Sequence, residues 1–167
     1  MSETLLNFAF WLRETPISVA IRVQPWLWPA CEIIHFIGLS LLVGVAGFFD
    51  LRLLGFLKQT VPLKAAHELI PWAKFGFALC AVTGVTFFLG APDQYVNNAA
   101  FYPKLLFLVI ALANAQFFET AYGRKVADIP LAVDTPRAYK AIAATSLTSW
   151  FMVMYWGRML PFIGNAF

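Results

Sequence analysis

Long apolar stretches alternate along the chain with short polar segments. The apolar stretches hold few charged side chains, and most of the charged residues lie in the segments between them. A helix needs roughly 20 mostly apolar residues to cross the hydrocarbon core of a bilayer. The pattern therefore predicts an all-α fold, an integral membrane four-helix bundle with crossings at residues 25–56, 71–90, 103–122 and 141–162.

Helix-breaking residues mark the ends of these crossings. Gly90 and Pro92 end the second crossing, because both residue types terminate helices. Pro103 suits the first turn of the third crossing, since the hydrogen-bond donor that proline lacks would be unpaired there anyway. The polar segments at residues 93–98 and 124–140 are predicted to be loops.

Residues 1–24 are less continuously apolar than the predicted crossings. The apolar residues of this segment are interrupted by Arg13, Glu14 and Pro16, and the segment has neither a basic start nor a small-residue cleavage site. These features favour an amphipathic helix lying in the membrane interface over a signal peptide. We therefore expect an interfacial segment at residues 1–24 and a transmembrane domain at residues 25–167.

Composition excludes an ordinary soluble domain. The chain is 60% hydrophobic and 13% charged, with a mean hydropathy of +0.71, whereas soluble domains contain about 25% charged residues. The net charge of +3 is spread over separate loops and forms no basic stripe, so it does not indicate nucleic-acid binding. The bilayer is the first partner that the sequence predicts.

The distribution of basic residues predicts the orientation. Lysine and arginine are more frequent in the loops that remain in the cytoplasm. The segments joining helices one to two and three to four hold Arg52, Lys58, Lys64, Lys74, Arg124, Lys125, Arg137 and Lys140, whereas the opposite side holds Arg13, Arg22, Lys104 and Arg158. Both termini should therefore face outward, toward the periplasm if this is a multi-pass protein of a bacterial inner membrane.

His35 is the first candidate functional residue. Ionisable side chains are expensive at membrane depth, so they usually face the interior of a bundle and bind or pair there. At 1.5 Å per residue, His35, Phe87, Arg158 and Met159 lie at similar depth, with Lys104 near the outer entry of helix three. We predict that these residues form one site near the outer leaflet.

The chemistry of this cluster suits an anionic cofactor, and haem b fits the description. Histidine from a bundle helix is a usual axial ligand of b-type haem, and methionine can supply the opposite face. His35 is thus the predicted iron ligand, Met159 a candidate second ligand, and Lys104 and Arg158 the predicted partners of the propionates. His67 precedes helix two on the inner side, too far from His35 to share a haem, and is predicted to be an interfacial residue.

Several other residues have open roles. Glu32, one turn before His35, could orient the imidazole or cap the outer end of its helix. Gly38, Gly44 and Gly47 let helices or a flat cofactor approach closely. Asp50 and Arg52 are expected to form an interfacial ion pair.

The two cysteines, Cys31 and Cys80, lie at different predicted depths. We therefore expect them to be free and to pack as small apolar side chains.

Particular runs of the chain resemble known membrane proteins. The run from His35 to Gly38 with Gly44, residues 50–55, 98–106 and 113–115, and the Gly157-Arg158 pair resemble an uncharacterised bacterial family of four-helix membrane proteins over nearly the whole chain. A histidine in helix one and a lysine beginning helix three are distantly similar to the four-helix membrane protoporphyrinogen oxidases and the membrane domain of the CopD copper-resistance family. Similarity to the oxidases implies haem ligation at His35 and an essential Lys104.

Three functions are consistent with these observations. The preferred one is a b-type haem protein with an electron-transfer or redox role, acting with a membrane or periplasmic redox partner. The second is a porphyrin oxidase using the same haem. The third is a cofactor-free protein, either a transporter or a membrane assembly subunit. Transport of copper would predict that His35 binds the metal with Met152, Met154 or Met159. The apolar surface is compatible with a homo-oligomer.

Overall fold

The computed structural model describes residues 3–163, and over that range every regular element is a helix, which confirms the predicted all-α class. The ends of the two predicted segments, residues 1–2 and 164–167, lie outside the described residues. The helices are α1 (Glu3–Arg13), α2 (Pro16–Val23), α3 (Leu27–Leu54), α4 (Leu63–His67), α5 (Ile70–Gly90), α6 (Pro92–Asn97), α7 (Phe101–Tyr122) and α8 (Arg137–Met159), with a 3₁₀ turn, η1, at Gly123–Asp128.

Three helical stretches are long and apolar enough to cross a membrane. They are Leu27–Leu54, Leu63–Gly90 and Phe101–Val126, and many of their large apolar side chains are exposed on the outside of the bundle. Such surfaces imply contact with lipid. The fourth long helix, α8, is equally extended but less apolar, because its first turn carries Arg137 and Lys140 and its middle is rich in serine and threonine.

Two predictions about the connecting segments were wrong. The segment at residues 93–98 is largely helical rather than a loop, because Pro92 opens the short helix α6 in its first turn. The segment at residues 1–24 holds two helices rather than one. Thr15 separates them, accepting a hydrogen bond at its side chain from the backbone N–H of Ser18, with Pro16 at the start of α2.

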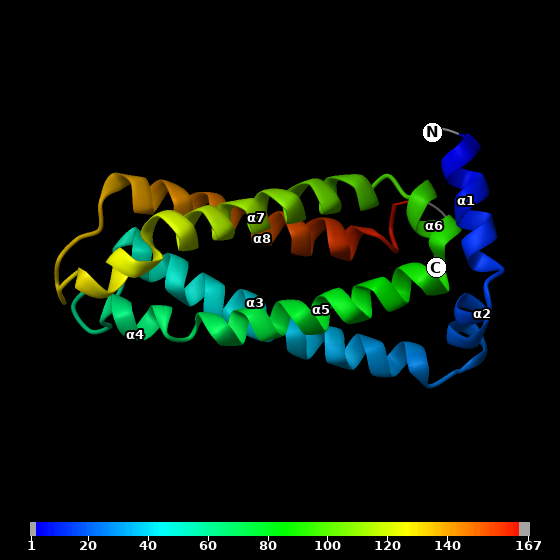
Figure 1. Ribbon diagram of the computed structural model, residues 1–167, viewed down its shortest axis with the longest axis horizontal. Helices are drawn as coiled ribbons and strands as arrows, with labels where there is room; N and C mark the ends of the chain where they lie inside the picture. Colours follow the sequence, from blue (N-terminus) through cyan, green and yellow to red (C-terminus); the bar gives the residue numbers. More distant parts are fainter. Residues whose placement is uncertain (1–2, 164–167) are drawn as a thin grey trace.

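The long helices form two hairpins that pack side by side. α3 lies along α5, α7 lies along α8, and contacts between α3 and α8 join the pairs (Figure 1). Gly38 and Gly76 form the crossing of α3 and α5, where a Cβ atom added to Gly38 would lie 2.8 Å from the carbonyl oxygen of Gly76. The small residues therefore let the two backbones touch.

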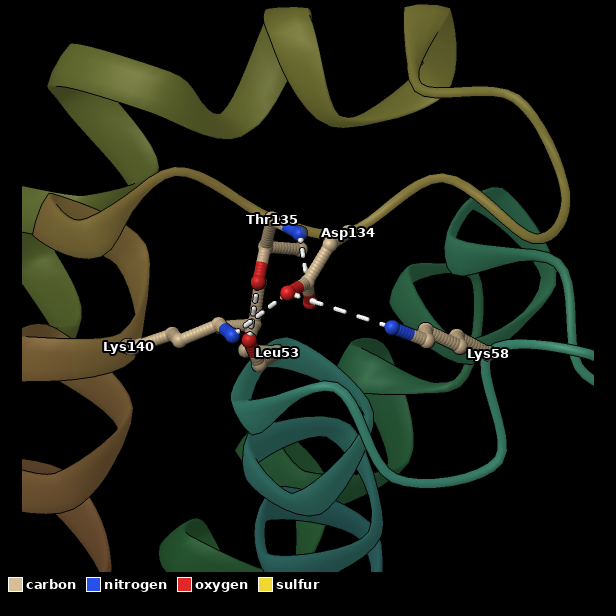
Figure 2. Close-up of polar contacts among 5 residues, drawn as sticks. All are labelled: Leu53, Lys58, Asp134, Thr135 and Lys140. Carbon is tan, nitrogen blue, oxygen red and sulfur yellow. Dashed lines mark hydrogen bonds and ion pairs between the residues drawn. The ribbon is translucent and has the colours of Figure 1, made fainter.

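Polar contacts fasten the connection between α7 and α8 to the end of α3 (Figure 2). Thr135 donates a side-chain hydrogen bond to the carbonyl oxygen of Leu53, and the Asp134 carboxylate lies 2.8 Å from Nζ of Lys140 and 3.9 Å from Nζ of Lys58. The hydrogen bond from Lys140 is the main reason that the pKa of Asp134 lies below its ordinary value. These contacts hold the start of α8 against α3.

The opposite end of the bundle is closed by α1, α2 and α6 (Figure 1). Arg13, the last residue of α1, forms an ion pair with Asp93 of α6. Asn98, which is buried, donates from Nδ2 to the carbonyl oxygen of Leu160, 2.8 Å away. The N-terminal helices are thereby attached to the bundle, while Phe8, Phe10 and Trp11 on α1 stay exposed. An interfacial position for α1 and α2 remains a prediction.

Candidate functional site

The His35 side chain is held by one hydrogen bond to the neighbouring helix. Its Nδ1 lies 2.7 Å from Oγ1 of Thr83 on α5. The Thr83 hydroxyl donates its own hydrogen to the carbonyl oxygen of Leu79, also at 2.7 Å, so it can only accept from His35. The hydrogen-bond network therefore assigns the proton to Nδ1 and leaves Nε2 as the nitrogen with a lone pair.

His35 lines a cavity of about 500 Å³ between the two hairpins. Lys104 from the start of α7 and Arg158 from the end of α8 line the same cavity, as the depth argument predicted. The walls between them are largely aromatic and come from α3, α5 and α6: they include Trp28, Phe36, Phe87 and Tyr95. The Phe87 ring contacts the imidazole edge-on, with 5.7 Å between ring centroids.

The charges around this cavity are mainly positive. Lys104 and Arg158 face a single carboxylate, Glu32. Glu32 does not orient His35, one of the two roles considered for it, because Oε1 accepts a hydrogen bond from Nε1 of Trp28 at 3.1 Å and Thr83 takes the Nδ1 position. An anionic group with an apolar body is the kind of ligand that such walls and charges suit.

Met159 is not among the residues that line the cavity. It packs instead near Tyr95 and Leu160, in the apolar cluster beneath α6. Met154 lines the cavity, together with Gly157 and Arg158 of the same helix. Residues three and four apart share one face of a helix, whereas Met159 is turned by a further 100° from Arg158. The structure therefore does not bring Met159 into the cavity lined by His35, Lys104 and Arg158.

His67 lies at the other end of the bundle, on α4. Its Nε2 is 3.2 Å from Oε2 of Glu119 on α7, and its ring contacts Phe49 with 5.6 Å between centroids. His67 and His35 therefore belong to separate places in the fold.

Asp50 and Arg52 do not form the predicted ion pair. Residues two apart point to different faces of a helix. Arg52 is fully buried and donates from Nε to the carbonyl oxygen of Val61 at 2.6 Å, whereas Asp50 lines a second cavity. Both cysteines are free, and Cys80 lies behind His35 with its Sγ 3.5 Å from the His35 carbonyl oxygen.

The described residues form no group of three or more His, Cys, Asp or Glu side chains that could hold a metal ion. At the His35 cavity, the lining offers one imidazole, the Glu32 carboxylate and the Met154 thioether, so a bound metal would be well served by further ligands from a cofactor.

No match to a known protein was found. Comparisons with models of protein families, with curated proteins and with solved structures gave no match to this chain. The geometry of the site is therefore the only guide to its chemistry.

Sequence reasoning missed Thr83 at this site, and it considered Met154 only as one of three methionines that could bind copper together with His35. Both lie in apolar helices at depths near that of His35, so the same depth argument could have included them. A lone threonine and one of four methionines carry little signal by themselves.

Proposed function

We propose that the protein is an integral membrane protein that binds b-type haem through His35 and serves an electron-transfer or redox role. The observation that carries this proposal is the hydrogen bond from Nδ1 of His35 to Thr83, which leaves Nε2 unprotonated on a side chain that lines the cavity. Histidines that bind metals almost always donate their other ring N–H to a neighbouring oxygen in this way.

The residues present fit a haem group. A porphyrin is flat and apolar, with two carboxylates at one edge, and the cavity offers aromatic walls together with Lys104 and Arg158. Its volume of about 500 Å³ lies within the range of about 300–1,000 Å³ typical of ligand sites. The porphyrin would also supply the metal ligands that the protein itself lacks. When bound, haem supplies a one-electron redox centre.

Each side chain has a defined task in this proposal. His35 holds the iron from α3, and Thr83 orients the imidazole. Lys104 and Arg158 bind the propionates by charge-assisted hydrogen bonds. Met154 rather than Met159 would be the methionine that helps to hold the iron, because it lies on the face of α8 that lines the cavity.

We also propose that α8 is a fourth crossing, which completes the bundle and places the His35 cavity near the outer, periplasmic leaflet of a bacterial inner membrane. The support is the asymmetry of charge. The end of the bundle that holds α4, η1 and the α7–α8 connection carries eight of the 12 lysines and arginines, as expected for the cytoplasmic side.

An absorption spectrum of the detergent-purified protein tests the proposal. We expect a Soret band and a sharp α-band on reduction, with a haem content near one per chain in a pyridine haemochrome assay. Replacing His35 with alanine should abolish both bands, whereas the matched variant His67→Ala should keep them.

Two results would contradict the haem assignment. Retention of haem by a folded His35→Ala variant, checked by its elution volume and melting temperature, would exclude His35 as the ligand. A colourless protein from haem-sufficient cells would instead favour a transporter or an assembly subunit. Oxidation of a porphyrin substrate by the haem-loaded protein would identify the oxidase.

A further inference from the structure

A second cavity lies in the half of the bundle nearer α4. It has a volume of about 320 Å³ and is bordered by all four long helices, α3, α5, α7 and α8. On α3 its lining runs from Leu42 to Asp50, and it shares no lining residue with the His35 cavity. None of the roles proposed above involves this cavity.

Asp50 is a buried carboxylic acid without full pairing. The residue is only 5% exposed, and Oδ2 has no hydrogen-bond partner within the described part of the chain. Ser146 of α8 interacts with the same carboxyl group and also lines the cavity. A charged carboxylate buried among apolar groups is strongly unfavourable unless a cation pairs with it. Among the described residues no ion pair involves Asp50, although its side chain lines a cavity.

The other charged groups at the cavity do not meet this need. Glu119 of α7 lines the cavity and is paired with His67, 3.2 Å away. Lys74 of α5 also borders it but is an exposed residue, and it forms no ion pair among the described residues. With Asp50 and Glu119 on opposite hairpins, the cavity is acidic, in contrast to the basic His35 cavity.

The walls of the cavity favour an organic cation over a metal ion. Four aromatic side chains line it, namely Phe49, Phe77, Phe118 and Trp150. The faces of such rings attract ammonium groups. The described residues form no cluster of three or more acidic, histidine or cysteine side chains, which a bare metal ion would need.

We propose that this second cavity binds a small organic cation, a protonated amine with an apolar or aromatic body, with Asp50 as its counter-ion. The ammonium group lies between the Asp50 carboxylate and the aromatic rings, and the apolar body fills the space lined by α5 and α7. Ser146 holds the Asp50 carboxyl group in place.

Calorimetric titration of the purified full-length protein with 2-phenylethylamine tests this proposal. We expect saturable binding, no comparable binding of the neutral analogue 2-phenylethanol, and a loss of affinity of about tenfold to a hundredfold in Asp50→Asn, because that change removes only the charge. Asp134→Asn, which removes an exposed carboxylate outside the cavity, is the matched control and should bind like the unmodified chain.

A second variant covers the case in which Asp50→Asn fails to fold. Ala115 is an exposed residue that borders the cavity from α7, so Ala115→Leu should weaken amine binding by filling space without changing charge. Absence of saturable amine binding, equal binding of the alcohol, or full affinity in folded Asp50→Asn would each overturn the proposal. The absorption spectrum of the same samples reports on the His35 site separately, so this result and the haem result can fail independently.

Discussion

At the scale of single residues, Thr83 determines which ring nitrogen of His35 is available to a ligand. An imidazole exposes one donor and one acceptor nitrogen, and the partner of the first determines which atom remains for a ligand. Thr83 is buried at 3% exposure and bonded through its own hydrogen to the helix backbone, so its lone pair is presented to His35. The two residues act as a unit across the α3–α5 interface.

Thr83→Val should therefore weaken haem binding without removing the iron ligand. The change keeps the shape of the side chain and removes the acceptor, and loss of such a supporting contact typically reduces metal affinity by about 10- to 100-fold. Haem titration of the protein depleted of haem measures the effect, and Thr83→Ser, which keeps the hydroxyl, should restore affinity.

Thr86→Val is the matched control for that experiment. Thr86 lies on the same helix and donates to the carbonyl oxygen of Val82 at 3.0 Å, away from His35. If Thr86→Val and Thr83→Val weakened haem binding equally, the effect would come from α5 itself and the assigned role of Thr83 would be wrong.

At the scale of elements, the crossing of α3 and α5 depends on two glycines. A Cβ atom on Gly38 would meet the Gly76 carbonyl oxygen at 2.8 Å and Leu79 Cβ at 2.9 Å. Gly44, six residues further along α3, has nothing within 4 Å of such an atom. The sequence predicted a close approach of helices or a flat cofactor at Gly38, Gly44 and Gly47, but of these three only Gly38 has no room for a Cβ atom.

Gly38→Ala and Gly44→Ala should therefore have opposite effects. Gly38→Ala forces two backbones apart, and overpacking of this kind costs about 1–3 kcal/mol. Gly44→Ala meets open space and should increase stability by up to about 1 kcal/mol, because alanine favours the helix. Unfolding of both variants in detergent micelles measures the difference, and equal destabilisation would contradict the observed crossing.

At the scale of the whole molecule, the bundle has two chemically different ends. One end carries the α7–α8 connection, held to α3 by Thr135 and Asp134 (Figure 2). The other is covered by α1, α2 and α6 (Figure 1). Three stretches are long and apolar enough to cross a membrane by length and composition, and the proposed fourth crossing, α8, is the less apolar helix that a topology experiment must test.

Single cysteines introduced after replacement of Cys31 and Cys80 by serine test the topology. In intact cells, a membrane-impermeant maleimide should label Asn97→Cys, at the end of α6, and Pro161→Cys, just after α8, because both lie at the end of the bundle that is proposed to face outward. Val133→Cys, in the α7–α8 connection, should be labelled only after permeabilisation. Labelling of Pro161→Cys and Val133→Cys from the same side would show that α8 does not cross.

The sequence by itself determined which residues of the long helices lie at a similar level along the bundle. Length and hydropathy predict the helices, and a constant rise of 1.5 Å per residue relates sequence number to depth. For this reason residue numbers alone predicted that His35, Lys104 and Arg158 lie together, and the three side chains do line one cavity.

Only the tertiary structure decided which way each side chain points around its helix axis. The helices are apolar on nearly all sides, because lipid and bundle interior are both apolar, so the sequence carries little information about rotation. Contacts between helices therefore selected Thr83 and Met154 for the His35 cavity and turned Met159 away. The same contacts placed the Asp50 side chain at the second cavity, so it does not pair with Arg52.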